Sequence, residues 1–161
     1  MDLQTDWPEI RRVFARAPYS SIASVDADGR PHVSPIGSLV LHREPGRGFF
    51  FERFTAALPR HLEEDAALCA LAVDMRLSLW LRALLRGAFP TAPGIRLAGR
   101  AVARREATER EVELFQRRVR PVRRTKGYRL LWGGLARGRE VHFDRVLPLR
   151  IGRMWPPADA A

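Results

Sequence analysis

Apolar residues recur at three- and four-residue intervals in four segments of the chain, a spacing that predicts four helices. The first covers residues 7–17, where a proline at position 8 suits a first helical turn. A short helix is expected over 56–65 and a compact amphipathic one over 77–86. The fourth begins at Thr108, where TERE has the form of a capping box, and ends near Val119.

Between these helices, alternating or continuous apolar runs predict six strands. They cover residues 19–25, 30–42, 49–54, 67–74, 95–106 and a last strand within 138–155. The DADG tetrapeptide supplies a hairpin turn between the first two, and Gly99 marks a β-bulge in the long fifth. Strands that follow one another as hairpins, with helices inserted, predict an antiparallel barrel with helical additions, a mainly β (α+β) fold.

The second predicted strand contains an oddity. Ser34, Pro35 and Gly37 interrupt a run that would otherwise pair cleanly. Proline removes a main-chain donor, and glycine allows another group to approach closely. Two interpretations stay open: a ligand or a partner chain lies against this strand, or the strand is an irregular edge with no ligand.

Length and composition favour one compact domain over residues 1–161, with no repeat and no dividing linker. The single cysteine excludes a disulfide framework. No charged-then-apolar leader opens the chain, and charged residues interrupt its longest apolar region, so we expect a cytoplasmic protein that does not span a membrane. Residues 75–94 form a helical insertion longer than a simple hairpin turn, which could cap a pocket or extend a dimer interface.

The chain carries 28 basic and 18 acidic residues, a formal net charge of +10, and Lys126 is its one lysine. Such a surplus attracts phosphates of any kind, including those of nucleic acid, an acidic membrane surface or a phosphorylated cofactor. The most basic stretch, 117–134, is interpreted as a solvated connection. Two alternatives remain: nucleic-acid binding, with Tyr128 and Trp132 as stacking surfaces, or a flank of a cofactor pocket that attracts an anionic substrate or a nicotinamide.

The sequence lacks the spacings of a histidine metal site, a GxSxG nucleophile elbow and a glycine-rich phosphate loop. One constellation remains, in FTAALPRHL. It sets Thr55, Arg60 and His61 close to the start of a short helix, where a hydroxyl, a guanidinium and an imidazole suit a phosphate monoester. The competing interpretation is a solvated helix face with ordinary surface charges.

Four features occur in a telling order: the DGRPHVSP hairpin, the aromatic strand FFFERF, the Thr-x4-Arg-His segment and the apolar strand after it. In that order, over residues 18–74, they resemble the pyridoxamine 5′-phosphate oxidase-like superfamily of FMN-binding split barrels. The resemblance implies a six-stranded Greek-key split barrel with flanking helices. It also implies a homodimer with the cofactor at the subunit interface.

The resemblance further implies a cofactor site. Ser34 to Gly37 would line the flavin, Phe54 and Thr55 would lie at the ring and ribityl-phosphate end, and Arg60 would grip the phosphate. His61 stands where the family often has lysine. Arg96 on the long strand would attract an anionic substrate or a nicotinamide cofactor. The cofactor-binding set is therefore Ser34, Pro35, Ile36, Gly37, Phe54, Thr55, Arg60, His61 and Arg96.

Two departures argue against vitamin B6 oxidation. Ser34 aligns where the oxidases that act on pyridoxamine phosphate carry arginine, and IGRMWPPADAA does not reproduce their basic tail. The leading hypothesis is a homodimeric FMN-binding oxidoreductase, with a deazaflavin as the alternative cofactor and a small molecule or nicotinamide as electron donor. The competing hypotheses are a non-catalytic flavin or haem binder on the same fold and a basic nucleic-acid-binding domain. No catalytic residue is assigned.

Overall fold

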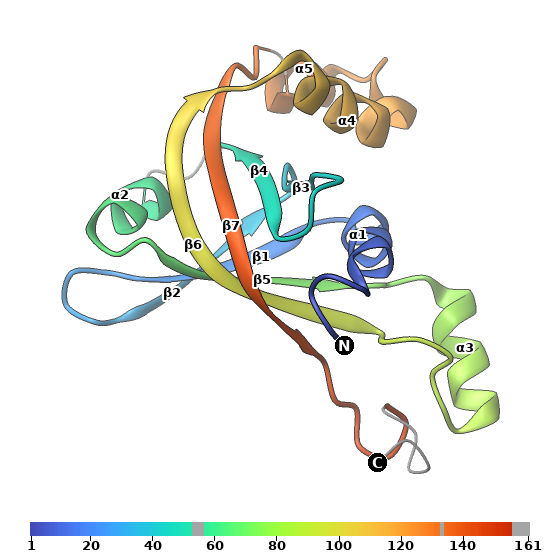
Figure 1. The fold of residues 1–161 in the computed structure, drawn as a ribbon. Coiled ribbons are helices and arrows are strands. Elements are labelled where there is room, and N and C mark those ends of the chain that lie inside the picture. The colour runs from blue at the N-terminus through green and yellow to red at the C-terminus, as the bar shows by residue number, and fades with distance from the viewer. Residues whose placement is uncertain (53–56, 133, 156–161) are drawn as a thin grey trace.

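The computed structural model describes residues 1–52, 57–132 and 134–155. Seven strands form one antiparallel sheet in the order β2-β1-β5-β6-β7-β4-β3 (Figure 1). The strands are β1 (Ser20–Val25), β2 (Pro31–Ile36), β3 (Val40–Leu41), β4 (Arg47–Phe51), β5 (Ala67–Val73), β6 (Gly94–Glu106) and β7 (Arg137–Pro148). The helices are α1 (Trp7–Arg16), α2 (Ala57–Glu64), α3 (Leu77–Arg86), α4 (Glu109–Val119) and α5 (Lys126–Trp132), with a 3-10 turn η1 (Arg120–Val122) before α5.

A short connection forces this sheet to curl. β2 and β3 lie at opposite edges of the sheet, yet only residues 37–39 join them. Seven strands laid flat would put their edges about 29 Å apart at the usual strand spacing. Four residue steps, from Ile36 to Val40, reach at most about 14 Å. The two edges are therefore brought together, and the sheet becomes a barrel that is split between β2 and β3.

This crossing is where the structure differs from the sequence-based prediction. The sequence predicts one return strand over residues 30–42 and therefore a six-stranded barrel. In the structure, β2 ends at Ile36 and β3 begins at Val40 on the other edge, so the sheet has seven strands. Ser38 holds the crossing in place, because its Oγ accepts from the amide of Phe51 at 3.1 Å and donates to the Phe51 carbonyl at 3.3 Å. A local pattern cannot reveal the change of edge, because strand order depends on contacts between distant segments.

The barrel interior is filled by one side of the sheet and by α1. Ile22, Ala70 and Leu97 follow one another across β1, β5 and β6 and are fully buried. Helix α1 contributes Ile10 and Phe14 to the same cluster. The apolar residues whose spacing predicts α1 therefore face the core.

Strand β4 is buried on both sides, which explains its unbroken FFF run. Phe50 belongs to the barrel cluster, whereas Phe49 and Phe51 belong to a second cluster with Phe115 of α4. Helices α4 and α5 cover this outer side of the barrel (Figure 1). The Thr108 capping box at the start of α4 is confirmed, with the Thr108 side chain accepting from the Glu111 amide and the Glu111 side chain accepting from the Thr108 amide.

The predicted bulge at Gly99 is also confirmed. The pairing of β6 with β7 shifts register between Ala98 and Gly99. A Cβ placed at Gly99 would lie 2.0 Å from the carbonyl oxygen of His142, so only glycine lets the two long strands approach here. The bulge lies within the arch that β6 and β7 make across the molecule (Figure 1).

Helix α3 occupies the predicted insertion and has apolar residues on two opposite sides. Leu79 and Ala83 are buried, in a small cluster with Phe89. On the other side, four leucines are between 54% and 80% exposed: Leu77, Leu81, Leu84 and Leu85. No helix among residues 1–52, 57–132 and 134–155 is both long and apolar enough to cross a membrane.

Candidate cofactor site

The first part of the predicted site, β2, forms a free edge of the sheet. The amide of Asp26 donates to the carbonyl of Arg30 at 3.0 Å, which sets the hydrogen-bonding phase of the β1–β2 hairpin. Main-chain bonds in an antiparallel pair recur at every second residue, so the main-chain groups of residues 31, 33 and 35 point away from β1. Pro31 and Pro35 occupy two of these positions. Val33 therefore supplies the outward N–H of β2, while all three residues offer carbonyls.

This geometry explains why the strand tolerates Pro35. The missing N–H falls on the open side, so no bond to β1 is lost. Prolines at such positions also discourage pairing with another strand and leave the edge available to a small molecule.

The four predicted residues of this strand and its end differ in their surroundings. Ser34 is half-buried and pairs with Ile22 of β1. Pro35 and Gly37 are exposed, whereas the Ile36 side chain lies in the barrel core. A Cβ placed at Gly37 would have no atom within 4 Å, so open space adjoins it.

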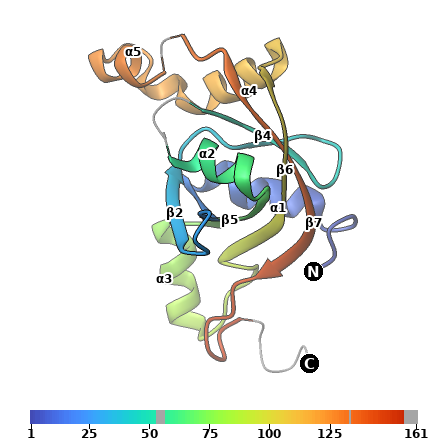
Figure 2. The ribbon, with the colours of Figure 1, turned by 90° about the vertical axis from the view of Figure 1, so that its left-hand side faces the viewer.

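The second part of the predicted site lies on α2, which packs beside the β1–β2 hairpin (Figure 2). His61 is 1% exposed, and its Nδ1 lies 3.2 Å from the hydroxyl of Ser24. Its ring also packs on that of His32 in β2, with centroids 4.5 Å apart. Arg60, the preceding residue, is exposed. The buried His61 thus packs α2 against the hairpin, and the adjacent Arg60 lies at the surface.

Phe54 and Thr55 lie outside the described residues, but the chain on either side is firmly held. The side chain of Glu52, directly after β4, is buried and pairs with Arg139 of β7 at 2.6 Å. Arg139 also reaches Glu63 of α2 at 3.3 Å, and Arg104 lies 3.0 Å from the second Glu52 oxygen. No local sequence pattern indicates this cluster, because its members come from four separate parts of the chain.

Arg96 lies on the outer face of the sheet, in the same cross-strand row as Pro35. The row runs from Pro35 through Ser21 and Leu71 to Arg96, and paired residues of an antiparallel sheet point to one side. Three strand spacings, about 14 Å, separate the ends of this row. Arg96 and the β2 edge therefore share a face without touching.

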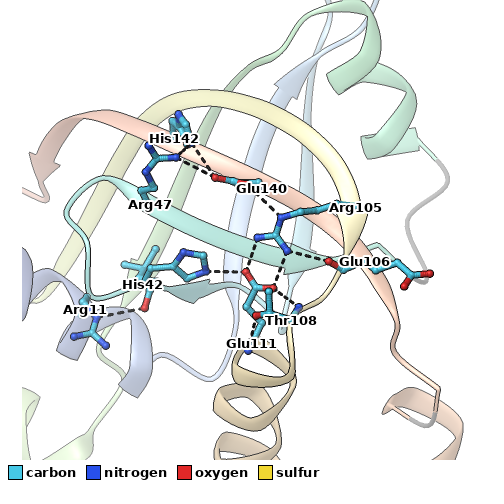
Figure 3. Close-up of polar contacts among 10 residues, drawn as sticks. Arg11, His42, Arg47, Arg105, Glu106, Thr108, Glu111, Glu140 and His142 are labelled. Atoms are coloured by element: carbon cyan, nitrogen blue, oxygen red, sulfur yellow. Dashed lines mark hydrogen bonds and ion pairs between the residues drawn. The ribbon is translucent and has the colours of Figure 1, made fainter.

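A second polar cluster lies apart from the predicted site, where β6 and β7 meet α4 (Figure 3). Arg105 binds Glu111 through two bonds of 2.7 and 2.9 Å, and its Nε lies 3.2 Å from Glu140. The Thr108 amide donates to Glu111 at 2.8 Å, and Nε2 of His42 lies 2.9 Å from the same carboxylate. Burial would raise the pKa of Glu111, but the bonds from Arg105 and Thr108 outweigh it and lower that pKa to about 2. Permanent charges that neutralise one another in this way indicate a structural role.

The two rings suggested as stacking surfaces in the basic stretch pack partly against the protein itself. The Trp132 ring packs on Phe115 with centroids 6.2 Å apart and on Tyr128 at 5.7 Å. Both rings thus complete the cluster beneath α4 and α5. Within the described part of the chain, no group of three or more histidine, cysteine, aspartate or glutamate residues could hold a metal ion.

Comparison with known proteins agrees with this architecture. The family model for pyridoxamine 5′-phosphate oxidase matches residues 7–135. HupZ from Group A Streptococcus superposes with a TM-score of 0.60 at 16% identity, covering 90% of this chain and 94% of its own. An FMN-binding protein from Syntrophomonas wolfei gives 0.59 at 17% identity, covering 91% and 87%. An F420 reductase gives 0.56 at 12% identity, covering 85% and 94%. No curated protein sequence matches the chain significantly. At such identities the structural likeness shows the split-barrel fold alone.

Proposed function

The chain belongs to the pyridoxamine 5′-phosphate oxidase-like split-barrel family, and from that premise we propose that it is an FMN-binding flavoprotein oxidoreductase. One observation carries the proposal: the open edge of β2 lies beside a helix that presents an exposed arginine, Arg60. An edge of main-chain groups suits a planar polar ring, and a guanidinium close by suits a phosphate. The net charge of +10 also favours the binding of such an anionic cofactor.

The residues present fit the group. The polar rim of a flavin ring carries both carbonyl oxygens and an N–H, and the β2 edge offers the Val33 amide together with the carbonyls of Val33 and Pro35. Open space at Gly37 leaves room for a ring at the strand end. Arg60 would bind the phosphate, together with Thr55 and with Phe54 at the ring, as the sequence resemblance implies.

A bound flavin accepts a hydride and passes electrons onward, so the redox chemistry is that of the cofactor. The chain would orient the ring on β2, balance the phosphate charge with Arg60 and exclude water from the reacting side. His61 acts in this scheme by positioning α2, because its ring is enclosed by Ser24 and His32.

We also propose that the protein is a homodimer with the cofactor at the subunit interface. Exposed apolar side chains support it: Tyr19 and Val33 are 57% and 68% exposed beside and on the hairpin, and the α3 leucines are equally open. Helix α3 and β2 both lie at the left of Figure 2, and Figure 1 shows them at opposite ends of the molecule. Exposed apolar area at both elements favours burial against a second copy. Arg96 on the sheet face between them would then serve an anion near the interface.

The experiment is a visible absorption spectrum of the protein as isolated, followed by mass analysis of the released ligand. A flavin spectrum with FMN released supports the proposal, and a released ligand with the mass of a deazaflavin would identify that cofactor instead. A haem spectrum, or no chromophore even after incubation with FMN, would refute it. Anaerobic addition of NADPH or NADH then tests catalysis, because bleaching of the bound flavin is expected of an oxidoreductase and its absence with every donor indicates a carrier.

A further inference from the structure

A pocket separate from the proposed flavin site lies between α1, β3 and α4. Its volume is about 340 Å³, near the lower end of the range for small-molecule sites. Its walls are mainly apolar, formed by Phe14, Leu39, Val40, Leu41 and Leu114. Ala15 and two arginines, Arg11 and Arg118, complete the lining. Neither β2 nor α2 contributes a residue to it.

Arg118 enters this pocket without a carboxylate. Its guanidinium donates to the carbonyl of Leu39 at 3.2 Å and to the carbonyl of Ala17, the C-cap residue of α1. No ion pair joins it to any acidic side chain of the described residues. Burial lowers the pKa of Arg118, which expresses the cost of holding an unneutralised cation away from water.

Arg11 repeats the pattern from α1. Its Nε donates to the carbonyl of Leu41 at 3.3 Å, and no carboxylate of the described residues pairs with it. Burial lowers the pKa of Arg11, and the nearby cations Arg43 and Arg110 lower it further. Two cations therefore line one small pocket with apolar walls and no negative charge.

Other enclosed arginines of this protein are neutralised. Arg105 is bound by Glu111 and Glu140, and Arg139 by Glu52 and Glu63. A partly buried cation without a counter-ion is unfavourable unless something else supplies the charge. The contrast singles out the α1–α4 pocket as a place where an anion would be stabilising.

We propose that this pocket binds an amphiphilic monoanion, a carboxylate carried on a short apolar body. The planar guanidinium fork matches a carboxylate, and each arginine keeps N–H groups beyond the one or two that its main-chain contacts use. The five apolar side chains would contact the body of the ligand. Because the lining excludes β2 and α2, this site goes beyond the proposed flavin function and can be tested independently of it.

The test uses sodium hexanoate as the probe in isothermal titration, with 1-hexanol as an uncharged probe of the same apolar length. Three proteins are compared: the native chain, Arg11→Gln in the pocket, and Arg12→Gln as the matched control. Arg12 lies on the same helix, is exposed, and donates to the carbonyl of Pro8 at 3.3 Å in the way that Arg11 donates to Leu41. Circular dichroism confirms that all three are equally folded.

The native chain and Arg12→Gln should bind hexanoate saturably and with equal affinity, and Arg11→Gln should bind it at least fivefold more weakly. Hexanol should bind the native chain at least fivefold more weakly than hexanoate. The proposal is overturned if the native chain shows no saturable hexanoate binding, if Arg11→Gln binds as well as Arg12→Gln, or if hexanol binds as well as hexanoate. A failure here leaves the spectrum of bound flavin unchanged, so it is distinguishable from failure of the proposed function.

Discussion

The ring of His61 on α2 packs on the ring of His32 on β2, with centroids 4.5 Å apart and a tilt of 48°. This contact joins the two elements that carry most of the described residues of the proposed cofactor site. Its inner partner is completely enclosed, and its outer partner remains half-exposed at 45% of the side chain. His61 therefore helps to position α2, together with Leu58 and Leu62, which the same helix buries in the core.

Replacing His61 with alanine should lower the free energy of unfolding by about 2–4 kcal/mol, because it empties a core volume and leaves the Ser24 hydroxyl without its partner. Urea denaturation followed by circular dichroism measures the change. His32→Ala removes the other imidazole of this pair, which is half-exposed, and should lower the free energy of unfolding by less than about 1 kcal/mol. Equal losses in the two variants would show that α2 is not fixed in this way.

Replacing Arg60 with alanine should weaken FMN binding roughly tenfold or more, because a charge-assisted hydrogen bond contributes about 1.5–3 kcal/mol. Fluorescence titration with FMN and with riboflavin separates the phosphate from the ring, so the loss should appear for FMN and not for riboflavin. Arg12→Ala, another exposed arginine, serves as control. Unchanged FMN affinity in the Arg60 variant would remove that residue from the site.

The two glycines at positions 37 and 99 should respond differently to alanine. Gly99→Ala should destabilise the protein by several kcal/mol, because the new Cβ would meet the His142 carbonyl at 2.0 Å. Gly37→Ala should leave stability within about 0.5 kcal/mol, since its Cβ would meet nothing within 4 Å. Thermal unfolding tests both. If a flavin ring lies against Gly37, that variant should also bind FMN more weakly while remaining equally stable.

The Glu111 carboxylate should make stability sensitive to acid. Its pKa falls from 4.5 to about 2 on folding, so its contribution is fully present above pH 4.5 and is lost as the pH falls toward 2. Glu111→Gln should therefore be less stable than the native chain by about 3 kcal/mol at pH 7, a difference that vanishes near pH 2. Urea titrations between pH 7 and 2 measure it. Glu113→Gln, whose ion pair with Arg117 is exposed, should show almost no difference at any pH.

Substituting the exposed leucines of α3 should affect assembly more than folding. The double variant Leu81→Gln/Leu85→Gln removes apolar area that is 54% and 79% exposed in the single chain, so unfolding should change little. Light scattering after size exclusion should show a dimer for the native chain and a monomer for the variant. Arg82→Gln/Arg86→Gln on the same helix is the control. A native monomer, or a variant that remains a dimer, would contradict the proposed interface.

The amino-acid pattern by itself determined most of the local structure. The Asp26–Gly29 turn, the capping box at Thr108 and the bulge at Gly99 were all predictable, because each depends on the backbone preferences or hydrogen bonds of adjacent residues. The order of such elements also sufficed to identify the family, since that order is a property of the chain.

Only the tertiary structure decided how these pieces meet. It moved residues 40–41 to the far edge of the sheet, and it enclosed His61 while exposing Arg60. It also joined the buried side chains of Glu52 and Arg139 to the exposed Glu63 in one cluster of charges. It also brought Arg11 and Arg118, more than a hundred residues apart, to one pocket. Contacts between distant segments depend on how the barrel closes and on which charges it encloses, and no local periodicity encodes either.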